Sequence, residues 1–430
     1  MRTIILIISL LIAQFAVAIP TIQHWQTANG TKVYFVPAPD LPMVNIEVVF
    51  DAGSARDGDK SGLAKLTNGL LNEGAGGYSA DQIAEKFDNL GAEFANLVDR
   101  DMAKVTLRSL VEPELLQPAL EMLALVLTKP DFEAKSLERV KQQMLTAIKY
   151  KQQSPSDIAN KAFYGAVFGE HPYAGLPGGT TETVTALTRE DLQKFHSQYY
   201  VSDNALISIV GALDRKAAEK LADTIAKLPN GTVPTAIPEV TLLTEAKTIH
   251  IDYPATQTKV LIGQPGLKRG DKDYFALYMG NYILGGGGLV SRLSEEVREK
   301  RGLAYSAYSY FMPQRVLGAF VAGLGTRNDQ TAQAIEIVEK TMQDFIKNGP
   351  TETELKEAKQ GITGRFPLRI KSNKDIVGYL SMLGFYNLPL DYLHNFNTNI
   401  EAITLPMIKD AFQRRLLLDK LVTVTVGGKH

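Results

Sequence analysis

Two segments of this chain, about half its length apart, share one pattern, and this internal repeat constrains the fold more than any other feature. The segments are ALTREDLQKFHSQYYVSDNALISIVGALD at 186–214 and AITLPMIKDAFQRRLLLDKLVTVTVGGKH at 402–430. Thr188 and Thr404 align at the same offset as Gly211 and Gly427, which is 216 positions (404 − 188 and 427 − 211). In each copy an amphipathic helical pattern leads into a β-branched strand that ends at glycine. The repeat therefore predicts two halves of similar fold.

The regions around the repeated segments indicate an α+β architecture. Residues 31–53 and 247–266 each read as two strands joined by a proline-containing turn. Helical periodicity extends over 79–90, 112–128, 131–152, 328–348 and 351–362. Strands at both ends of each half, with helices between them, predict two homologous α+β domains, each a mostly antiparallel sheet with helices on one face. Residues 228–246 contain three prolines and read as an extended linker. We therefore expect domains at 19–227 and 247–430 that form a clamshell around a chamber.

The N-terminal residues and the composition bear on where the protein works. Residues 1–18 have one cation, Arg2, then an apolar core and the sequence Ala-Val-Ala, which is typical of a secretory signal peptide. The chain has no cysteine, which excludes disulfides, thiol catalysis and thiolate metal sites, and in an exported protein favours a bacterial periplasm. The formal net charge of −1 gives no reason to expect a nucleic-acid partner. No further apolar run has the length of a membrane span.

The stretch SGLAKLTNGLLNEGA, residues 61–75, is predicted to be a helix with an unusual polar face. Leu63, Leu66 and Leu70 have the spacing of one buried face. Lys65 and Gly69 lie on the other face, and a glycine inside a helix costs about 1 kcal/mol relative to alanine. Positions 65, 68 and 69 have the spacing i, i+3, i+4, which is the spacing of the metal-binding sequence H-x-x-E-H.

A second stretch, LGGGGLVSRLSEEVREKRGLAYSAYSYF at 284–311, contains four consecutive glycines, which leave the backbone unusually free. Charged residues from Arg292 to Arg301 then predict an exposed helix whose opposite face is apolar. Gly302 ends this helix, and the sequence at 303–311 alternates as a strand does.

These two stretches resemble the insulinase/pitrilysin-like (inverzincin) metallopeptidases, in which GLAHxxEHxxFxGT is the usual form of the first. The resemblance implies that Lys65 and Gly69 replace the two zinc-binding histidines and that Asn68 replaces the general-base glutamate. The third ligand, a glutamate on a later helix, aligns near Gln143. Gly69 has no donor atom and lysine is normally a cation, so we expect neither a zinc site nor a catalytic residue in this chain.

In the second stretch the resemblance implies that an arginine and a tyrosine seven residues apart hold the backbone of the substrate. These residues are Arg298 and Tyr305 here, and both are present. A guanidinium and a phenol can each donate hydrogen bonds to peptide carbonyls without selecting a side chain. An ion pair and a core tyrosine are the structural alternative for the same two residues.

No other metal site is expected from the sequence. The six histidines are His24, His171, His196, His250, His394 and His430, and none form a pair with the spacing of adjacent ligands on a helix or strand. His171 lies in a loop common in the family and is assigned no chemistry. For Lys65 two interpretations remain open: its ammonium group pairs with Asn68 or Gln143 in the vacated site, or it is a solvated lysine facing a wet cavity.

The resemblance implies a non-catalytic, substrate-positioning subunit of a heteromeric zinc metallopeptidase that cleaves peptides. Its expected partner is a paralogous, zinc-bearing subunit, in a heterodimer or a larger assembly, and zinc is expected in that partner. A peptide is expected to lie against a sheet edge. The alternatives are a scaffold or assembly protein, a stand-alone peptide-binding protein, and an active enzyme with an unrecognised site. Self-association without the partner is also possible.

Overall fold

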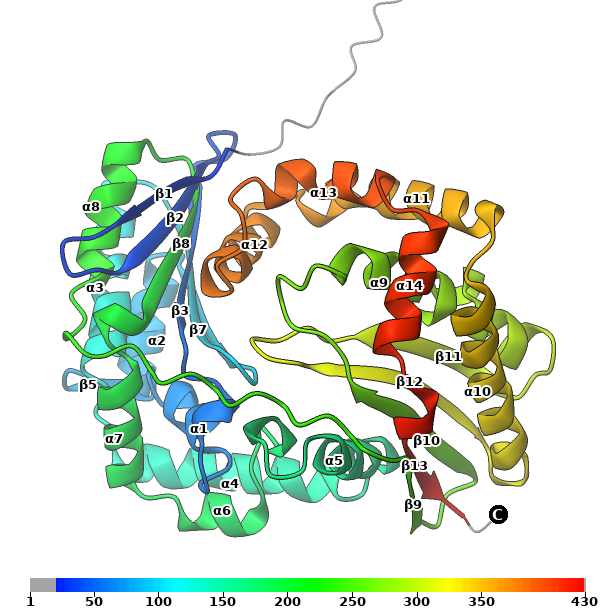
Figure 1. The fold of residues 1–430 in the computed structure, drawn as a ribbon. Helices are drawn as coiled ribbons and strands as arrows, with labels where there is room; N and C mark the ends of the chain where they lie inside the picture. Colours follow the sequence, from blue (N-terminus) through cyan, green and yellow to red (C-terminus); the bar gives the residue numbers. More distant parts are fainter. Residues whose placement is uncertain (1–20, 429–430) are drawn as a thin grey trace, which may run out of the picture.

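The structure is a computed structural model that describes residues 21–428, so the predicted signal peptide at 1–18 lies outside the described residues. It contains two large mixed sheets, each with its own group of helices (Figure 1). The first sheet has six strands in the order β1-β2-β8-β3-β7-β6, and the second has five in the order β11-β12-β10-β13-β9. The first comprises β1 (Gln23–Gln26), β2 (Lys32–Pro37), β3 (Met43–Phe50), β6 (Glu93–Val98), β7 (Ala103–Leu110) and β8 (Ala205–Gly211). The second comprises β9 (Lys247–Asp252), β10 (Gln257–Pro265), β11 (Ala304–Phe311), β12 (Ala319–Arg327) and β13 (Val422–Gly427).

The two sheets have the same topology, which explains the internal repeat. The order β2-β8-β3-β7-β6 in the first sheet corresponds to β9-β13-β10-β12-β11 in the second. In both, one pair is parallel (β2 with β8, and β9 with β13) and the other three pairs of this core are antiparallel. The aligned Thr188 and Thr404 each precede the helix that leads into an interior strand, β8 or β13. The expected α+β fold with two homologous halves is confirmed.

Among residues 21–428, the first half contains eight α-helices and the second half six. The first half contains α1 (Leu63–Gly69), α2 (Ala80–Asn89), α3 (Pro113–Thr128), α4 (Ala134–Lys151), α5 (Pro155–Phe168), α6 (Thr181–Ala186), α7 (Arg189–Tyr199) and α8 (Arg215–Ile225). The second contains α9 (Tyr274–Asn281), α10 (Thr331–Asn348), α11 (Glu352–Arg365), α12 (Asn373–Phe385), α13 (Tyr392–Glu401) and α14 (Leu405–Arg415). None of the helices in 21–428 has the length and apolar character needed to cross a membrane.

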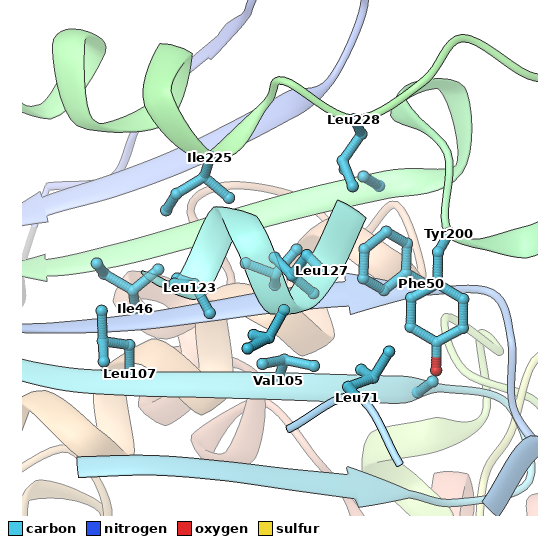
Figure 2. Packing of buried hydrophobic residues seen from close by; sticks show 14 of the residues in the cluster. Ile46, Phe50, Leu71, Val105, Leu107, Leu123, Leu127, Tyr200, Ile225 and Leu228 are labelled. Atoms are coloured by element: carbon cyan, nitrogen blue, oxygen red, sulfur yellow. The ribbon is translucent and has the colours of Figure 1, made fainter. Parts of the chain in front are cut away.

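The main core of the first half lies between its sheet and its own helices (Figure 2). Ile46 and Phe50 of β3 and Val105 of β7 point toward Leu123 of α3 and Ile225 of α8. The corresponding core of the second half includes Phe320 of β12, Phe345 of α10 and Phe412 of α14. Burial of these alternating strand residues against helices is the main source of stability in such a layered fold.

The other face of each sheet is covered by a helix from the opposite half. Helix α12 packs on β8, β3 and β2 of the first sheet, and α5 packs on β13 and β10 of the second. In Figure 1, α12 lies alongside the first sheet, far from the rest of the first half in sequence. Gly384 of α12 allows this approach, because a Cβ there would lie 2.2 Å from the Leu206 side chain. The sequence analysis predicted helices on one face only. It could not predict the exchanged helices, because an apolar helix face does not reveal which sheet it covers.

Two predicted helices differ from the structure. The helix expected at 61–75 is short, α1 ending at Gly69, so this glycine stands at the last position of the helix and not in its middle. The exposed helix expected between Arg292 and Arg301 is irregular, with a π-helical turn at Ser294–Glu299. Residues 228–243 contain no helix or strand, but Ile237 and Val240 are buried against the second sheet, so the linker is anchored there.

A buried carboxylate joins the two halves at the loop after β6. Asp101, which is 1% exposed, accepts hydrogen bonds from the Tyr173 phenol (2.5 Å) and, across the boundary between the halves, from the Tyr386 phenol (2.8 Å) and the Arg315 backbone N–H (2.9 Å). Arg315 also pairs with Asp51 of the first half. A buried carboxylate needs such donors, because water cannot reach it.

We predict that Tyr386→Phe lowers the free energy of unfolding by about 1–3 kcal/mol, because the buried Asp101 loses one donor of a charge-assisted hydrogen bond. Urea denaturation measures this loss. Tyr150→Phe is the control, because Tyr150 is 70% exposed and the change removes the same hydroxyl group. Equal stability of the two variants would contradict a role for Asp101 in joining the halves.

Candidate functional site

The helix with the H-x-x-E-H spacing, α1, is fixed at its N-terminus by a buried carboxylate. Asp57 accepts the N–H groups of Gly62 (2.8 Å) and Ala64 (2.7 Å), which are otherwise unpaired at a helix start. Burial raises the pKa of Asp57 to about 7, although these two hydrogen bonds oppose the shift. Gly62 has a φ of +97°, a conformation that favours glycine. The chain thus enters α1 in one defined orientation.

Asn68 points into the core of the first half. It is 1% exposed, and its Nδ2 donates a hydrogen bond to the Tyr200 phenol at 3.1 Å. Its backbone carbonyl accepts a hydrogen bond from the Asn96 side chain of β6 at 3.0 Å. Tyr200 stacks on His196, with ring centroids 4.9 Å apart, and lies against Phe50 (Figure 2). The residue that replaces the general base therefore has a structural role, tying α1 to its neighbours.

The other three degenerate positions are the exposed polar residues Lys65 and Gln143 and the glycine Gly69, which has open space beside it. Lys65 is exposed and makes no hydrogen bond or ion pair within 21–428, so the structure contains no pairing of Lys65 with Asn68 or Gln143. Desolvation by surrounding protein atoms lowers the Lys65 pKa, and the charge of Lys151 lowers it further. Gln143 is exposed on α4, which packs against α1. A Cβ at Gly69 would meet no atom within 4 Å.

These four positions do not fit a zinc ion. Zinc in proteins is bound by imidazole, thiolate or carboxylate groups, and an ammonium group, two amides and a glycine provide none of these. Within 21–428 no group of three His, Cys, Asp or Glu side chains has a metal-binding arrangement either. No hydrolytic step is therefore assigned to α1. The absence of a cofactor from the chain stays a prediction.

Arg298 and Tyr305 lie together at the start of β11. The guanidinium carbon of Arg298 is 5.0 Å from the centroid of the Tyr305 ring, a cation–π distance. Tyr305 is 85% exposed, and the Arg298 side chain is about one-third exposed, with Nε 3.3 Å from the Glu299 carboxylate. The pairing of β11 with β12 shifts register between Ala304 and Ala307, so Tyr305 lies in a bulge. Arg298 thus forms an ion pair, as the structural alternative expects, but Tyr305 is exposed and is not a core residue.

The glycine run before Arg298 packs closely against β11 at Gly285. A Cβ at Gly285 would lie 2.5 Å from the backbone nitrogen of Ser309, so this glycine permits close approach to β11. The Asn281 side chain donates to the Ser309 carbonyl at 3.0 Å. Only Gly288 of the run has a positive φ, +71°. Packing against the strand, and not backbone freedom, explains Gly285.

Sequence reasoning predicted a sheet edge for peptide binding without identifying it. Strand β6 pairs only with β7 among the described strands and lies beside α1. Glu93 and Ala95 of β6 are exposed, and Leu97 is 61% exposed. An edge strand presents unpaired backbone N–H and C=O groups that can pair with an extended peptide. Strand order could not be read from the sequence, which is why β6 was missed.

The fold has two homologous α+β halves, and α1 has the H-x-x-E-H spacing without the metal ligands. Arg298 and the exposed Tyr305 lie together in the second half. These features define the class of this protein as a metallopeptidase homologue that has lost its metal site. The family comparison agrees. The sequence profile described as "Insulinase (Peptidase family M16)" matches residues 32–176, and that described as "Peptidase M16 inactive domain" matches 186–362. The chain belongs to the M16 family, as a homologue that lacks the zinc-binding residues.

Individual relatives support this assignment. The structure is similar to that of a peptidase M16 inactive domain from Pseudomonas fluorescens, with 40% identity, a TM-score of 0.92, and coverage of 95% of this chain and 98% of that one. A Helicobacter pylori protein named "Non-peptidase homolog YmxG" is 27% identical over 94% of both chains. A Bacillus subtilis protein named "Uncharacterized zinc protease YmxG" is 26% identical over 82% of this chain and 85% of its own length.

We predict that acid destabilises the protein through His196. The buried His196 imidazole donates a hydrogen bond from Nε2 to the Leu127 carbonyl at 2.9 Å, and burial lowers its pKa from 6.5 to about 4. Because the folded-state pKa lies below the unfolded one, stability present above pH 6.5 is lost as the pH falls toward 4, by roughly 3 kcal/mol. Burial raises the pKa of Asp57, so protonation of Asp57 stabilises the folded protein as the pH falls through the same range. The quantity to measure is therefore the difference in the free energy of unfolding between the wild type and His196→Gln.

Urea denaturation at several pH values measures this difference. The advantage of the wild type over His196→Gln should shrink between pH 6.5 and 4. A difference that does not change with pH would contradict the assignment of a neutral, buried His196.

We also predict that Gly69→Ala raises the free energy of unfolding by up to about 1 kcal/mol, because the site is helical and has room for a Cβ. Gly285→Ala is the matched control and should destabilise the protein, because its Cβ would overlap the Ser309 backbone. Thermal unfolding of both variants tests this. Destabilisation by Gly69→Ala would show that the vacated space at α1 is closed.

Proposed function

We propose that this chain is the non-catalytic, substrate-positioning subunit of a heteromeric zinc metallopeptidase that cleaves peptides. The observation that carries the proposal is the contact between Arg298 and the largely exposed Tyr305, in a chain whose α1 offers no zinc ligands. A tyrosine exposed to this extent adds little to a core, so a role in binding explains it better than a role in stability.

The chemistry of the pair suits a peptide backbone. Arg298 offers N–H donors and Tyr305 an O–H donor, and peptide carbonyls accept both. The cation–π contact holds the two groups in one orientation, which lowers the entropy lost when they bind a substrate. Strand β6 offers a second element of recognition, because its open edge can pair with an extended chain. Neither element selects a particular side chain.

Bond cleavage is assigned to a zinc-bearing paralogous subunit. In this division of labour the partner supplies a zinc-activated water molecule, and this chain holds the peptide. Two observations support this assignment: α1 has no zinc ligands, and the inactive-domain profile matches residues 186–362. We further propose that the protein works in a bacterial periplasm, on the basis of the signal-like sequence at 1–18 and the absence of cysteine.

We predict that Arg298→Ala and Tyr305→Phe each lower the peptide turnover of the complex about tenfold, because each removes a hydrogen bond to the substrate. The complex is purified from the native organism, and turnover is measured with and without each variant chain. Arg215→Ala and Tyr150→Phe are the controls, because both remove the same groups from positions in the first half, away from the pair: Arg215 lies on α8 with its side chain 40% exposed, and Tyr150 is 70% exposed. Unchanged turnover in the double variant would disprove the substrate-holding role.

The same preparation separates the alternative functions. A scaffold protein would bind no peptide in isothermal titration. A stand-alone binding protein would bind peptide but would elute without a partner in size-exclusion chromatography. An enzyme with an unrecognised site would show chelator-sensitive cleavage by the pure chain.

A further inference from the structure

The internal repeat gives α1 a counterpart in the second half, α9 with the residue that follows it. Helix α1 follows β3, and α9 follows β10, the counterpart of β3. The burial pattern of residues 63–69 recurs at 276–282 except at the third position, where Lys65 is exposed and Tyr278 is partly buried, so that Lys65, Asn68 and Gly69 correspond to Tyr278, Asn281 and Tyr282. The Asn68 backbone carbonyl accepts a hydrogen bond from Asn96 of β6. The Asn281 side chain donates a hydrogen bond to the Ser309 carbonyl of β11, the counterpart of β6. The second half thus contains a site equivalent to the degenerate metal site.

A cavity of about 640 Å³ lies at this equivalent site, between α9, β11 and the C-terminal end of α11. Its lining contains five tyrosines and three arginines, and no aspartate, glutamate or lysine. The arginines are Arg269, Arg365 and Arg369. Its volume falls within the usual range for small-molecule and peptide pockets and far exceeds that of a simple inorganic anion.

The positive charge in this cavity is not neutralised by carboxylates. Arg365 makes no hydrogen bond or ion pair within 21–428, and Nε of Arg269 is buried without a hydrogen-bond partner. The contacts of Arg369 are with the phenol groups of Tyr278 and Tyr379. The carboxylates that follow Arg269 in sequence do not compensate, because Asp271 and Asp273 are bound by Arg414 and Arg415.

The tyrosines add planar, partly apolar walls. Tyr274 stacks on Tyr278 with ring centroids 5.9 Å apart, and Tyr308 stacks on Tyr310 at 5.6 Å with nearly parallel planes. A tyrosine ring combines an apolar face with a hydroxyl group for a polar contact. The Tyr308 hydroxyl already accepts a hydrogen bond from Lys259, and Arg369 contacts Tyr278, so the free faces are those of the remaining rings. A ligand that uses both walls and arginines therefore needs an anionic group attached to an apolar or aromatic body.

We propose that this cavity binds a peptide carboxylate, from an acidic side chain or from the C-terminus, with a neighbouring residue packed on the tyrosines. Guanidinium groups form paired hydrogen bonds with the planar carboxylate, which matches the fork geometry of arginine. This inference rests on the proposed function, because it specifies the kind of peptide that Arg298 and Tyr305 hold. Tyr305 and Tyr310 lie on the same strand, about 15 Å apart, which an extended peptide spans with about five residues.

Direct binding to the full-length chain tests the inference. The probes are a fluorescently labelled peptide with an internal Glu and a free C-terminus, the same peptide with Gln for Glu, and the same peptide with an amidated C-terminus. Fluorescence anisotropy at low ionic strength gives each affinity. We expect one of the two neutralised peptides to bind about tenfold more weakly, which identifies the source of the carboxylate.

Arg365→Gln should lower the affinity for the acidic peptide about tenfold and leave the affinity for the matching neutral peptide unchanged. Lys356→Gln is the matched control, because it removes one exposed positive charge from the same helix. Arg369→Gln provides a second variant, and circular dichroism verifies that each variant is folded. Inorganic phosphate serves as a competitor of the wild type.

The outcomes separate this inference from the proposed function. Equal binding of all three peptides, with no effect of Arg365→Gln or Arg369→Gln, overturns the carboxylate site and leaves peptide binding intact. If no peptide binds, the proposed function is overturned together with the inference. Binding of phosphate but of no peptide overturns the assignment of the cavity to peptides.

Discussion

The exchange of one helix between the halves is the constraint on which the rest of the structure depends. Each sheet is apolar on both faces, and its own half covers only one of them. Helices α5 and α12 cover the remaining faces, so that neither half can withdraw without exposing a core. Asp101 adds a directional contact at the same boundary, because its carboxylate accepts hydrogen bonds from both halves. Hydrophobic burial thus holds the halves together, and hydrogen bonds fix their orientation.

This arrangement explains how a metal site can disappear while the fold persists. Helix α1 is held by Asp57 at its start and by the Asn68–Tyr200 contact near its end, and neither contact needs a metal. Asn68 takes over a packing role at the position where the family has a reactive glutamate. At Gly69 there is open space, because no atom lies within 4 Å of where a Cβ would stand. Loss of chemistry at α1 therefore required little change elsewhere.

Much of the architecture could be predicted from the sequence, and the failures have physical causes. The repeat and the periodicities predicted two α+β halves and the helices later found as α2, α3, α4, α10 and α11. The end of α1 was misplaced, because apolar spacing continues through Leu70 although the helix stops at Gly69. The packing role of Gly285 was missed, because a glycine that permits close packing has the same sequence signature as one that leaves the backbone free. The edge strand β6, the exchanged helices and the arginine cavity depend on contacts between distant segments, which periodicity does not encode.

The differences between the two halves bear on the proposed role of this chain in peptide recognition. Equivalent positions in one duplicated framework now carry different side chains, a lysine and a glycine at α1 and two tyrosines at α9. The first set leaves an open, polar surface beside the β6 edge, and the second lines a cavity whose arginines pair with no carboxylate among residues 21–428. A peptide is a long ligand, and its affinity rises when separate parts of it are bound at fixed spacing. Because the exchanged helices hold the two halves together, substitutions at either site would, under the proposed function, alter peptide recognition without altering the framework that positions both sites.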